Sequence, residues 1–311
     1  MGTADVFAGS REQAIAAGLT SVDRCYPTVE EALAATDAEA VLVTASLVGH
    51  VPAARAALEA GLHVLIEKPF APSVAEAEEL VALADQRGLT VAVSQNYRFF
   101  PAVRAVQRIV AHRTYGDLHA VALDFRQMSG SDGAASAHHA LDEPLLVDMS
   151  IHHVDLIRTV LGREITTVDL RTWNPSWSLF TGPCEGAGLI ESGPDLVTSY
   201  RASWVSSGQR TAWAGEWRMD FADAEVWWTS RGDGPEGWRS DEVRVRRGGT
   251  VETLSLPTVS RVDRAGSLTE FVTAIGEGRE PSISGRNNLG SLAATYAAVE
   301  SARTRQPVAL S

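Results

Sequence analysis

A chain of 311 residues is longer than one ordinary domain, so we expect two domains. Its composition, 45% hydrophobic and 21% charged, is typical of a globular protein, and its formal charge of −12 argues against nucleic-acid binding, which needs a basic surface. The sequence shows no apolar run of membrane-spanning length and no signal core at the N-terminus. Cys25 and Cys184 have neither metal-binding nor redox spacing, which predicts a reduced, cytoplasmic protein.

Strands and helices alternate along residues 6–94. Apolar runs predict strands at 6–8, 40–44, 63–66 and 90–94. Capping boxes predict helices that open at Ser10, Thr28 and Ser73, and an alanine-rich helix is predicted at 52–60. Strict alternation implies right-handed crossovers and a parallel sheet that is covered on both faces.

The pattern changes after Ser94. Helices are predicted at 100–111, 144–161, 267–276 and 290–303. Strands are predicted at 118–125, 167–171, 196–205, 211–221, 224–228 and 243–246. All eight tryptophans lie here, and aromatic strands joined by turns favour one large, mostly antiparallel sheet. We therefore expect an α/β first domain over residues 1–97 and an α+β second domain over residues 98–311.

Glu67, Lys68 and Pro69 follow the strand predicted at 63–66. In open α/β sheets, ligands bind at the carboxyl ends of the strands. An acid and a base at this edge, with Pro69 favouring an extended chain at Lys68, are candidates for chemistry. The alternative is an ordinary surface ion pair.

A second candidate group lies in the helix predicted at 144–161, where Asp148 and His152 are four residues apart and share a helix face. A carboxylate that fixes an imidazole tautomer makes a positioned general base, and Asp155 is spaced to do the same. The alternative is a half-buried histidine with ordinary polar partners.

The two candidate groups suit one reaction. His152 would take the proton of a substrate hydroxyl, and Lys68 would stabilise the charge that develops on the oxygen. A hydride would leave the same carbon for a nicotinamide, because side chains cannot accept a hydride.

In these motifs the sequence resembles the Gfo/Idh/MocA family, named after glucose–fructose oxidoreductase and inositol dehydrogenase. The resemblance covers almost the whole chain and rests on residues 57–69, 96–99, 148–155 and 281–310. It implies a Rossmann-like dinucleotide-binding domain followed by an α+β domain with a large sheet. It also implies an NAD(P)-dependent oxidoreductase that acts on a hydroxyl or carbonyl group of a sugar, polyol or inositol-like substrate.

The resemblance carries over to individual positions. Lys68, Asp148 and His152 match the family's catalytic group. The positions that match the cofactor site are Ser10, Arg11, Thr44, Ala45, Ser46, His50, Glu67, Lys68 and Asn96. The positions that match the substrate site are Lys68, Arg98, Asp148, His152 and His153.

Three departures from the family pattern stand out. Ala45-Ser46-Leu47 replaces Thr-Pro-Asn, and Asp142-Glu143-Pro144 replaces the glycines that precede the catalytic aspartate. The family also opens with a strand, Gly-x-Gly-x-x-Gly and a helix, whereas the strand predicted at 6–8 matches the family's second strand. We expect this difference to separate the strands near Val6 and Cys25 from the later ones, and the true start to lie upstream; the alternative is a differently folded first domain.

Ser10 and Arg11 fall where the ribose 2′-position would lie, and a basic residue there suits the 2′-phosphate of NADP. The alternative is that Ser10 only caps a helix and Arg11 faces solvent. We expect NAD or NADP, with no firm choice between them.

Two other functions remain open. One is a non-catalytic, dimerising relative that has lost nucleotide binding. The other is a metal-dependent hydrolase that uses His138, His139, His152 and His153, but adjacent histidines point in different directions, so we expect no metal. We expect a small sugar-like substrate, no nucleic-acid or membrane partner, and a homodimer or homotetramer formed through the exposed sheet face.

Overall fold

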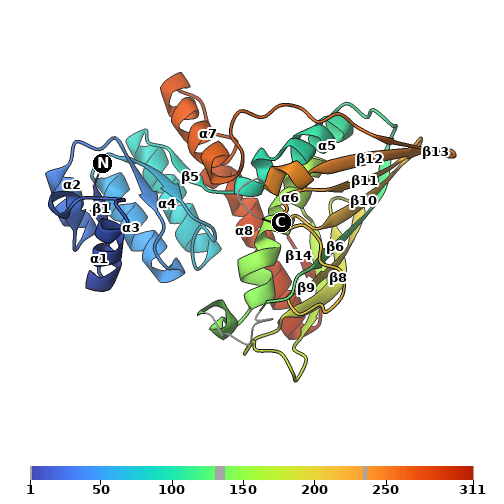
Figure 1. Cartoon of the computed structure of the whole chain (residues 1–311), viewed down its shortest axis with the longest axis horizontal. Coiled ribbons are helices and arrows are strands. Elements are labelled where there is room, and N and C mark those ends of the chain that lie inside the picture. The colour runs from blue at the N-terminus through green and yellow to red at the C-terminus, as the bar shows by residue number, and fades with distance from the viewer. Residues whose placement is uncertain (1, 130–136, 234–236, 311) are drawn as a thin grey trace. The chain divides into compact units, whose positions relative to one another are not determined.

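The computed structural model of the protein describes residues 2–129, 137–233 and 237–310, which fold as two compact units (Figure 1). The first unit comprises Met1–Ser94 and Glu270–Leu289. The second comprises Gln95–Thr269 and Gly290–Ser311.

The first unit contains two separate parallel sheets. β1 (Thr3–Ala4) pairs with β2 (Cys25–Tyr26), and β3 (Ala40–Val43), β4 (His63–Ile66) and β5 (Val91–Val93) form the other sheet. The connecting helices are α1 (Ala8–Ala16), η1 (Val22–Arg24), α2 (Val29–Ala35), α3 (Leu47–Glu59) and α4 (Val74–Arg87). The predicted separation of the first two strands from the later three is confirmed. As a result, Leu42 on β3 is 55% exposed.

Two of the predicted helix caps in this unit are confirmed and one is wrong. Thr28 and Ser73 each accept a hydrogen bond from a backbone N–H three residues on, and so cap α2 and α4. Ser10 lies inside α1, which begins at Ala8.

The strand predicted at 6–8 is also wrong, because the chain turns directly after β1. The Asp5 carboxylate accepts a hydrogen bond from the Phe7 N–H at 2.8 Å, a local bond of the kind that starts turns. Phe7 is 72% exposed, so no burial favours a strand there.

The second unit is built on a nine-stranded sheet of order β13-β12-β11-β10-β6-β9-β8-β7-β14. Only β6 and β9 pair in parallel, which agrees with the predicted mostly antiparallel sheet. The strands are β6 (Leu118–Arg126), β7 (Thr167–Trp173), β8 (Glu185–Glu191), β9 (Val197–Ser203), β10 (Glu216–Phe221), β11 (Glu225–Thr229), β12 (Glu242–Arg247), β13 (Thr250–Thr253) and β14 (Val308–Ala309).

Helices cover one face of this sheet. Figure 1 shows α5 (Pro101–Ala111), α6 (Ile151–Leu161) and α8 (Gly285–Thr304) on that face. Side chains on the strands alternate accordingly: on β10, Trp217 is fully buried and Arg218 points to the other face. The Trp217 ring stacks on Trp228 at 4.7 Å within one continuous core. Truncating a core tryptophan to alanine typically costs about 3–5 kcal/mol.

Four predicted helices differ in their bounds or type. α3 begins at Leu47 rather than at residue 52, and Ser46 occupies its N-cap position without a side-chain cap hydrogen bond. α7 (Asp263–Glu277) and α8 also begin earlier than predicted. The helix predicted at 144–161 is a π-helical segment, η4 (Pro144–Ser150), that continues as α6.

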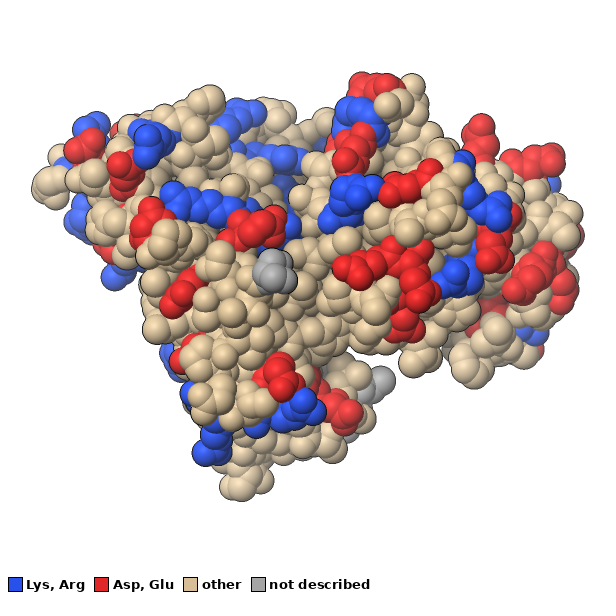
Figure 2. Space-filling model, turned by 180° about the vertical axis from the view of Figure 1, so that it is seen from behind, with Lys and Arg blue, Asp and Glu red and all other residues tan. Residues whose placement is uncertain are grey.

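The described surface carries charged side chains of both signs. Figure 2 shows acidic and basic side chains interspersed over one face of the protein. No helix within the described ranges is both long and apolar enough to cross a membrane.

Candidate active site

The parallel pairing of β3 and β4 brings two predicted cofactor segments together in the first unit. Val43 pairs with Ile66, and the Glu67 N–H donates to the Val43 carbonyl at 2.9 Å. Residues 44–46 and 67–68 therefore leave the sheet side by side at its carboxyl edge, where α/β proteins bind ligands. Ser46 there occupies the N-cap position of α3.

His50 links these two segments. It is buried, with Nδ1 lying 2.7 Å from the Pro69 carbonyl oxygen and Nε2 lying 3.0 Å from that of Ala45. An imidazole donates through whichever nitrogen carries the proton, so His50 binds one carbonyl and lies against the other. This predicted cofactor residue thus fixes the turn after β3 relative to the peptide that follows Lys68.

Lys68 stands at this edge and is the only lysine among the 27 lysines and arginines of the chain. The two residue types differ chemically: arginine is a planar, permanently charged fork, whereas lysine is a compact ammonium that changes protonation more readily. All the other basic positions of the chain, apart from histidine, carry arginine, and only the carboxyl end of β4 carries a side-chain ammonium. That the sequence contains a single lysine marks Lys68 as a candidate functional residue more specifically than the Glu-Lys-Pro motif does.

The carboxyl end of β1 carries Asp5, which the sequence analysis did not identify. In dinucleotide-binding folds, an acid near this point binds the ribose hydroxyls. Ser10 and Arg11 instead lie in α1, and the Arg11 guanidinium donates to the Asp5 backbone carbonyl at 2.6 Å. The sequence analysis placed this strand a few residues too late, at 6–8, and so missed Asp5.

In the second unit, Asn96 and Arg98 belong to η2 (Asn96–Phe99) and both are buried. The Asn96 amide donates to the Asp263 carboxylate. Arg98 forms a two-pronged ion pair with Asp155, its Nε lying 2.6 Å from Oδ2. Asp155 was predicted to hold His152, but its carboxylate is engaged by Arg98.

A second arginine extends this ion pair. Ser291 on α8 donates to Asp155 Oδ1 at 2.7 Å and accepts from Arg158 Nη1 at 2.7 Å. Arg158 also binds the Glu164 carboxylate through two nitrogens. Gly290 leaves room for this side chain, because a Cβ there would lie 2.5 Å from Arg158 Nη2. The network joins η2, α6 and α8.

His152, near the start of α6, is 7% exposed and stacks on Tyr97 of η2. The two ring centroids are 4.0 Å apart and the ring planes differ by 2°. This stack fixes the plane of the imidazole. It depends on residues 55 positions apart in the chain, a separation that residue spacing could not reveal.

Charged groups surround the stacked phenol. The Arg231 guanidinium lies 4.6 Å from the Tyr97 ring centroid. Burial raises the pKa of the Tyr97 phenol, Arg231 opposes this rise, and Asp263 and Asp148 reinforce it. Asp148 and His152 thus both act on the Tyr97 ring, His152 by stacking and Asp148 through its charge.

His153, predicted to bind substrate, lies fully buried in the core of the second unit. Its Nε2 donates to the Trp213 carbonyl at 3.1 Å, and its Nδ1 lies 2.9 Å from the Tyr200 hydroxyl. The Tyr200 hydroxyl also lies 2.7 Å from Ser150 Oγ. Both nitrogens have protein partners, so we omit His153 from the proposed chemistry.

The histidines considered as metal ligands do not converge in the described part of the chain. The His139 Nε2 lies 3.1 Å from Ser129 Oγ, and its ring meets Phe180 edge-on. The side chain of His138 lies outside the described residues. Within the described ranges, no three His, Cys, Asp or Glu residues are placed to hold a metal ion.

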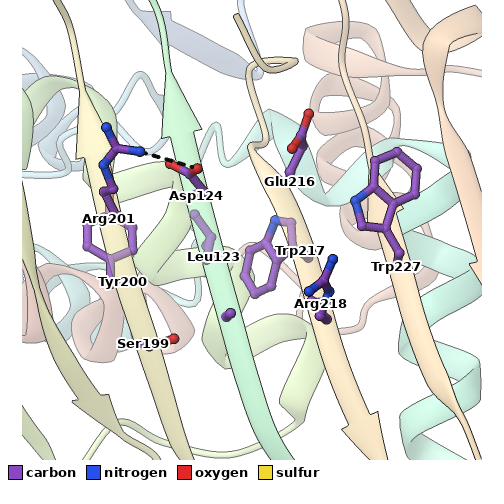
Figure 3. Close-up of a pocket in the computed structure, with 10 residues that line it drawn as sticks. Leu123, Asp124, Ser199, Tyr200, Arg201, Glu216, Trp217, Arg218 and Trp227 are labelled. Carbon is purple, nitrogen blue, oxygen red and sulfur yellow. Dashed lines mark ion pairs between the residues drawn. The ribbon is translucent and has the colours of Figure 1, made fainter. Parts of the chain in front are cut away.

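The helix-free face of the large sheet carries a shallow groove of about 360 Å³ (Figure 3). Arg201 and Asp124 form an ion pair at 3.6 Å across neighbouring strands of this face. Trp227 and Arg218 also line it. This groove is distinct from the cluster around His152, which lies on the helix-covered side.

Burial of His153 predicts acid sensitivity, because desolvation lowers the pKa of this histidine to about 4 from 6.5. Between these values the unfolded chain takes up a proton that the folded protein excludes. The stabilising contribution is complete above about pH 6.5 and falls by about 3 kcal/mol as the pH drops to 4. Urea unfolding at a series of pH values should show this loss.

The variant His153→Gln should flatten that pH dependence, whereas His112→Gln, at an exposed position, should leave it unchanged. An unchanged slope in His153→Gln would contradict the assignment.

Two family models match the chain. Residues 4–95 match that of the Gfo/Idh/MocA oxidoreductase family with its NAD-binding Rossmann fold. Residues 103–222 match that of the GFO/IDH/MocA C-terminal domain.

Individual proteins that are similar to this chain agree with the two family models. D-apiose dehydrogenase of Paraburkholderia graminis is 25% identical over 306 residues, 93% of this chain and 77% of that protein. UDP-N-acetylglucosamine 3-dehydrogenase of Acidithiobacillus ferrooxidans is 30% identical over 168 residues, 54% of this chain and 49% of that protein. The crystal structure of an aldose–aldose oxidoreductase of Caulobacter crescentus shares the fold, with a TM-score of 0.85 and 18% identity, over 100% of this chain and 91% of that chain. The protein therefore belongs to the Gfo/Idh/MocA family of oxidoreductases.

Proposed function

We propose that this protein transfers a hydride between NAD and a hydroxyl-bearing carbon of a sugar, polyol or inositol-like substrate. The observation that carries the proposal is the position of the chain's only lysine at the carboxyl edge of the NAD-binding sheet. Three similar proteins named for sugar or aldose oxidation support the substrate class.

The proposed roles follow from the chemistry of the groups. In the oxidation direction, His152 accepts the proton of the substrate hydroxyl, and the plane of its imidazole is set by Tyr97. Asp148 favours the cationic ring through its negative charge. The Lys68 ammonium stabilises the charge that develops on the substrate oxygen. When bound, the nicotinamide accepts the hydride from the same carbon.

Several residues of the first unit fit the dinucleotide. Asp5 follows β1, where its carboxylate would accept hydrogen bonds from the ribose hydroxyls. The N-terminus of α3, beginning after Ser46, directs backbone N–H groups of its first turn toward the carboxyl end of β3. We base the cofactor assignment on these residues.

The role of Lys68 predicts a specific loss of turnover. A panel of aldoses, polyols, inositols and nucleotide sugars should yield at least one substrate in a nicotinamide absorbance assay. Lys68→Ala and Lys68→Arg should each lower kcat by about 100-fold or more, because a guanidinium does not reproduce the ammonium. Arg87→Ala, at an exposed position at the end of α4, is the matched control.

A readout independent of turnover uses the single lysine. Reductive methylation with carbon-13 formaldehyde labels only Lys68 and the amino terminus, because the chain has no other lysine. Added NADH should shift the Lys68 methyl resonance in an NMR spectrum. No shift, combined with no turnover on the panel, would reject the proposal and favour a non-catalytic relative.

The position of Asp5 predicts a preference for NADH over NADPH, because its carboxylate would repel a 2′-phosphate. Calorimetric titration should give about tenfold or tighter binding of NADH. Asp5→Ser should reduce this preference, whereas Asp23→Ser, at an exposed position before β2, should preserve it. Tighter binding of NADPH by the wild-type protein would overturn the choice and favour Arg11 as a phosphate ligand.

We also propose that a second copy of the chain covers the helix-free sheet face. Two neighbouring rows cross this face: a mainly acidic one with Asp124, Glu216 and Glu242, which continues to Arg201 on β9, and a basic one with Arg218 and Arg244. A twofold axis can place the acidic row of each copy over the basic row of the other, as a symmetric dimer requires. The groove of Figure 3 lies between these rows.

Light scattering should therefore give a dimeric mass for the wild-type protein. Arg218→Glu should shift the measured mass toward that of the monomer, because the new glutamate of each copy would face the acidic row of the other. Arg303→Glu, on the exposed side of α8, should remain dimeric. A monomeric wild-type protein would contradict this assembly.

A further inference from the structure

Gln95 lies in an uninterrupted run of buried residues that extends from Val91 to Val103. The three residues that follow it have protein partners: Asn96 and Arg98 bind carboxylates, and Tyr97 stacks on an imidazole. Gln95 is 1% exposed, and both its Nε2 and its Oε1 are buried without a hydrogen-bond partner in the part of the chain that the structure describes.

Such an amide lowers the stability of the fold. A buried donor and acceptor lose their bonds to water, and an unpaired group carries that full desolvation penalty. Few groups in a native protein are left this way, and those that are call for a role outside the packing of the fold. An apolar side chain of the same size would fill the space of Gln95 at no such cost.

The place of Gln95 in the chain suggests what the amide is for. It directly follows Ser94, whose N–H donates to the Ile66 carbonyl at 2.7 Å and so prolongs the parallel ladder beyond β5. Gln95 thus stands at the carboxyl end of a parallel strand, where α/β proteins bind ligands. Unlike its three neighbours, it presents a free donor and a free acceptor together.

We propose that the Gln95 side-chain amide binds a neutral ligand group that both donates and accepts a hydrogen bond. The assignment rests on the proposed function, which supplies two such groups: a hydroxyl of the substrate and the carboxamide of the nicotinamide. Gln95 is then a binding residue whose amide is satisfied only when the ligand is present.

The first test measures the ligand-free protein and needs no activity. Gln95→Met replaces the amide by an apolar chain of similar shape and should raise the Tm by about 2–4 °C. The matched control is Gln127→Met, because Gln127 is equally buried in the same unit but donates through Nε2 to the Thr211 carbonyl at 2.7 Å. This control should lower the Tm and leave ligand binding unchanged.

The second test identifies the ligand group. If the substrate hydroxyl is bound, Gln95→Met should raise KM about tenfold or more and leave the Kd of NADH unchanged. If the nicotinamide carboxamide is bound, the Kd of NADH should rise by a similar factor, while the Kd of ADP-ribose, which lacks the nicotinamide, should not change.

A fall in Tm for Gln95→Met would overturn the Gln95 assignment but not the proposed function, because the amide would then have protein partners in solution. A rise in Tm with unchanged KM and Kd values would overturn it as well. A wild-type protein that neither binds dinucleotide nor turns over any substrate would overturn the proposed function and this assignment together.

Discussion

The buried ion pair between Arg98 and Asp155 is the constraint on which the second unit's candidate site depends. Replacing a buried pair by apolar residues is often neutral, whereas removing one partner typically costs about 3–5 kcal/mol, so the value of the pair lies in what it positions. It joins η2 to α6, and through Ser291 it joins α6 to α8. With these elements fixed, Tyr97 and His152 meet as parallel rings.

In the first unit, the parallel pairing of β3 and β4 has the corresponding role. It places the turn at residues 44–46 beside Lys68, and His50 links the two segments through contacts with carbonyl oxygens. The hydrogen-bonded ladder fixes where both strands end relative to each other. The chain's single lysine stands here, and its ammonium differs from the guanidinium used at the other basic positions in shape and protonation as well as in charge.

The sequence predicted what is local and periodic. It placed β4 and the caps of α2 and α4 correctly, because a short apolar run and a capping box are each complete within a few residues. It missed β8, whose Gly186 and Gly188 hide the strand pattern, and it misplaced β1, whose two residues are too short for periodicity. The sequence could not reveal long-range contacts: the partner of Asp155 and the ring on which His152 stacks come from η2, 57 and 55 residues earlier in the chain.

The central claim is transfer of a hydride between a nicotinamide and a substrate carbon, and isotope transfer tests it most directly. The protein would be incubated with the carbonyl form of a sugar substrate and NADH deuterated on the transferred position of the nicotinamide, and the product examined by mass spectrometry and NMR. The account predicts one deuterium on the new hydroxyl-bearing carbon. Product that carries no deuterium from the cofactor, or no product from a protein that binds NADH, would contradict it.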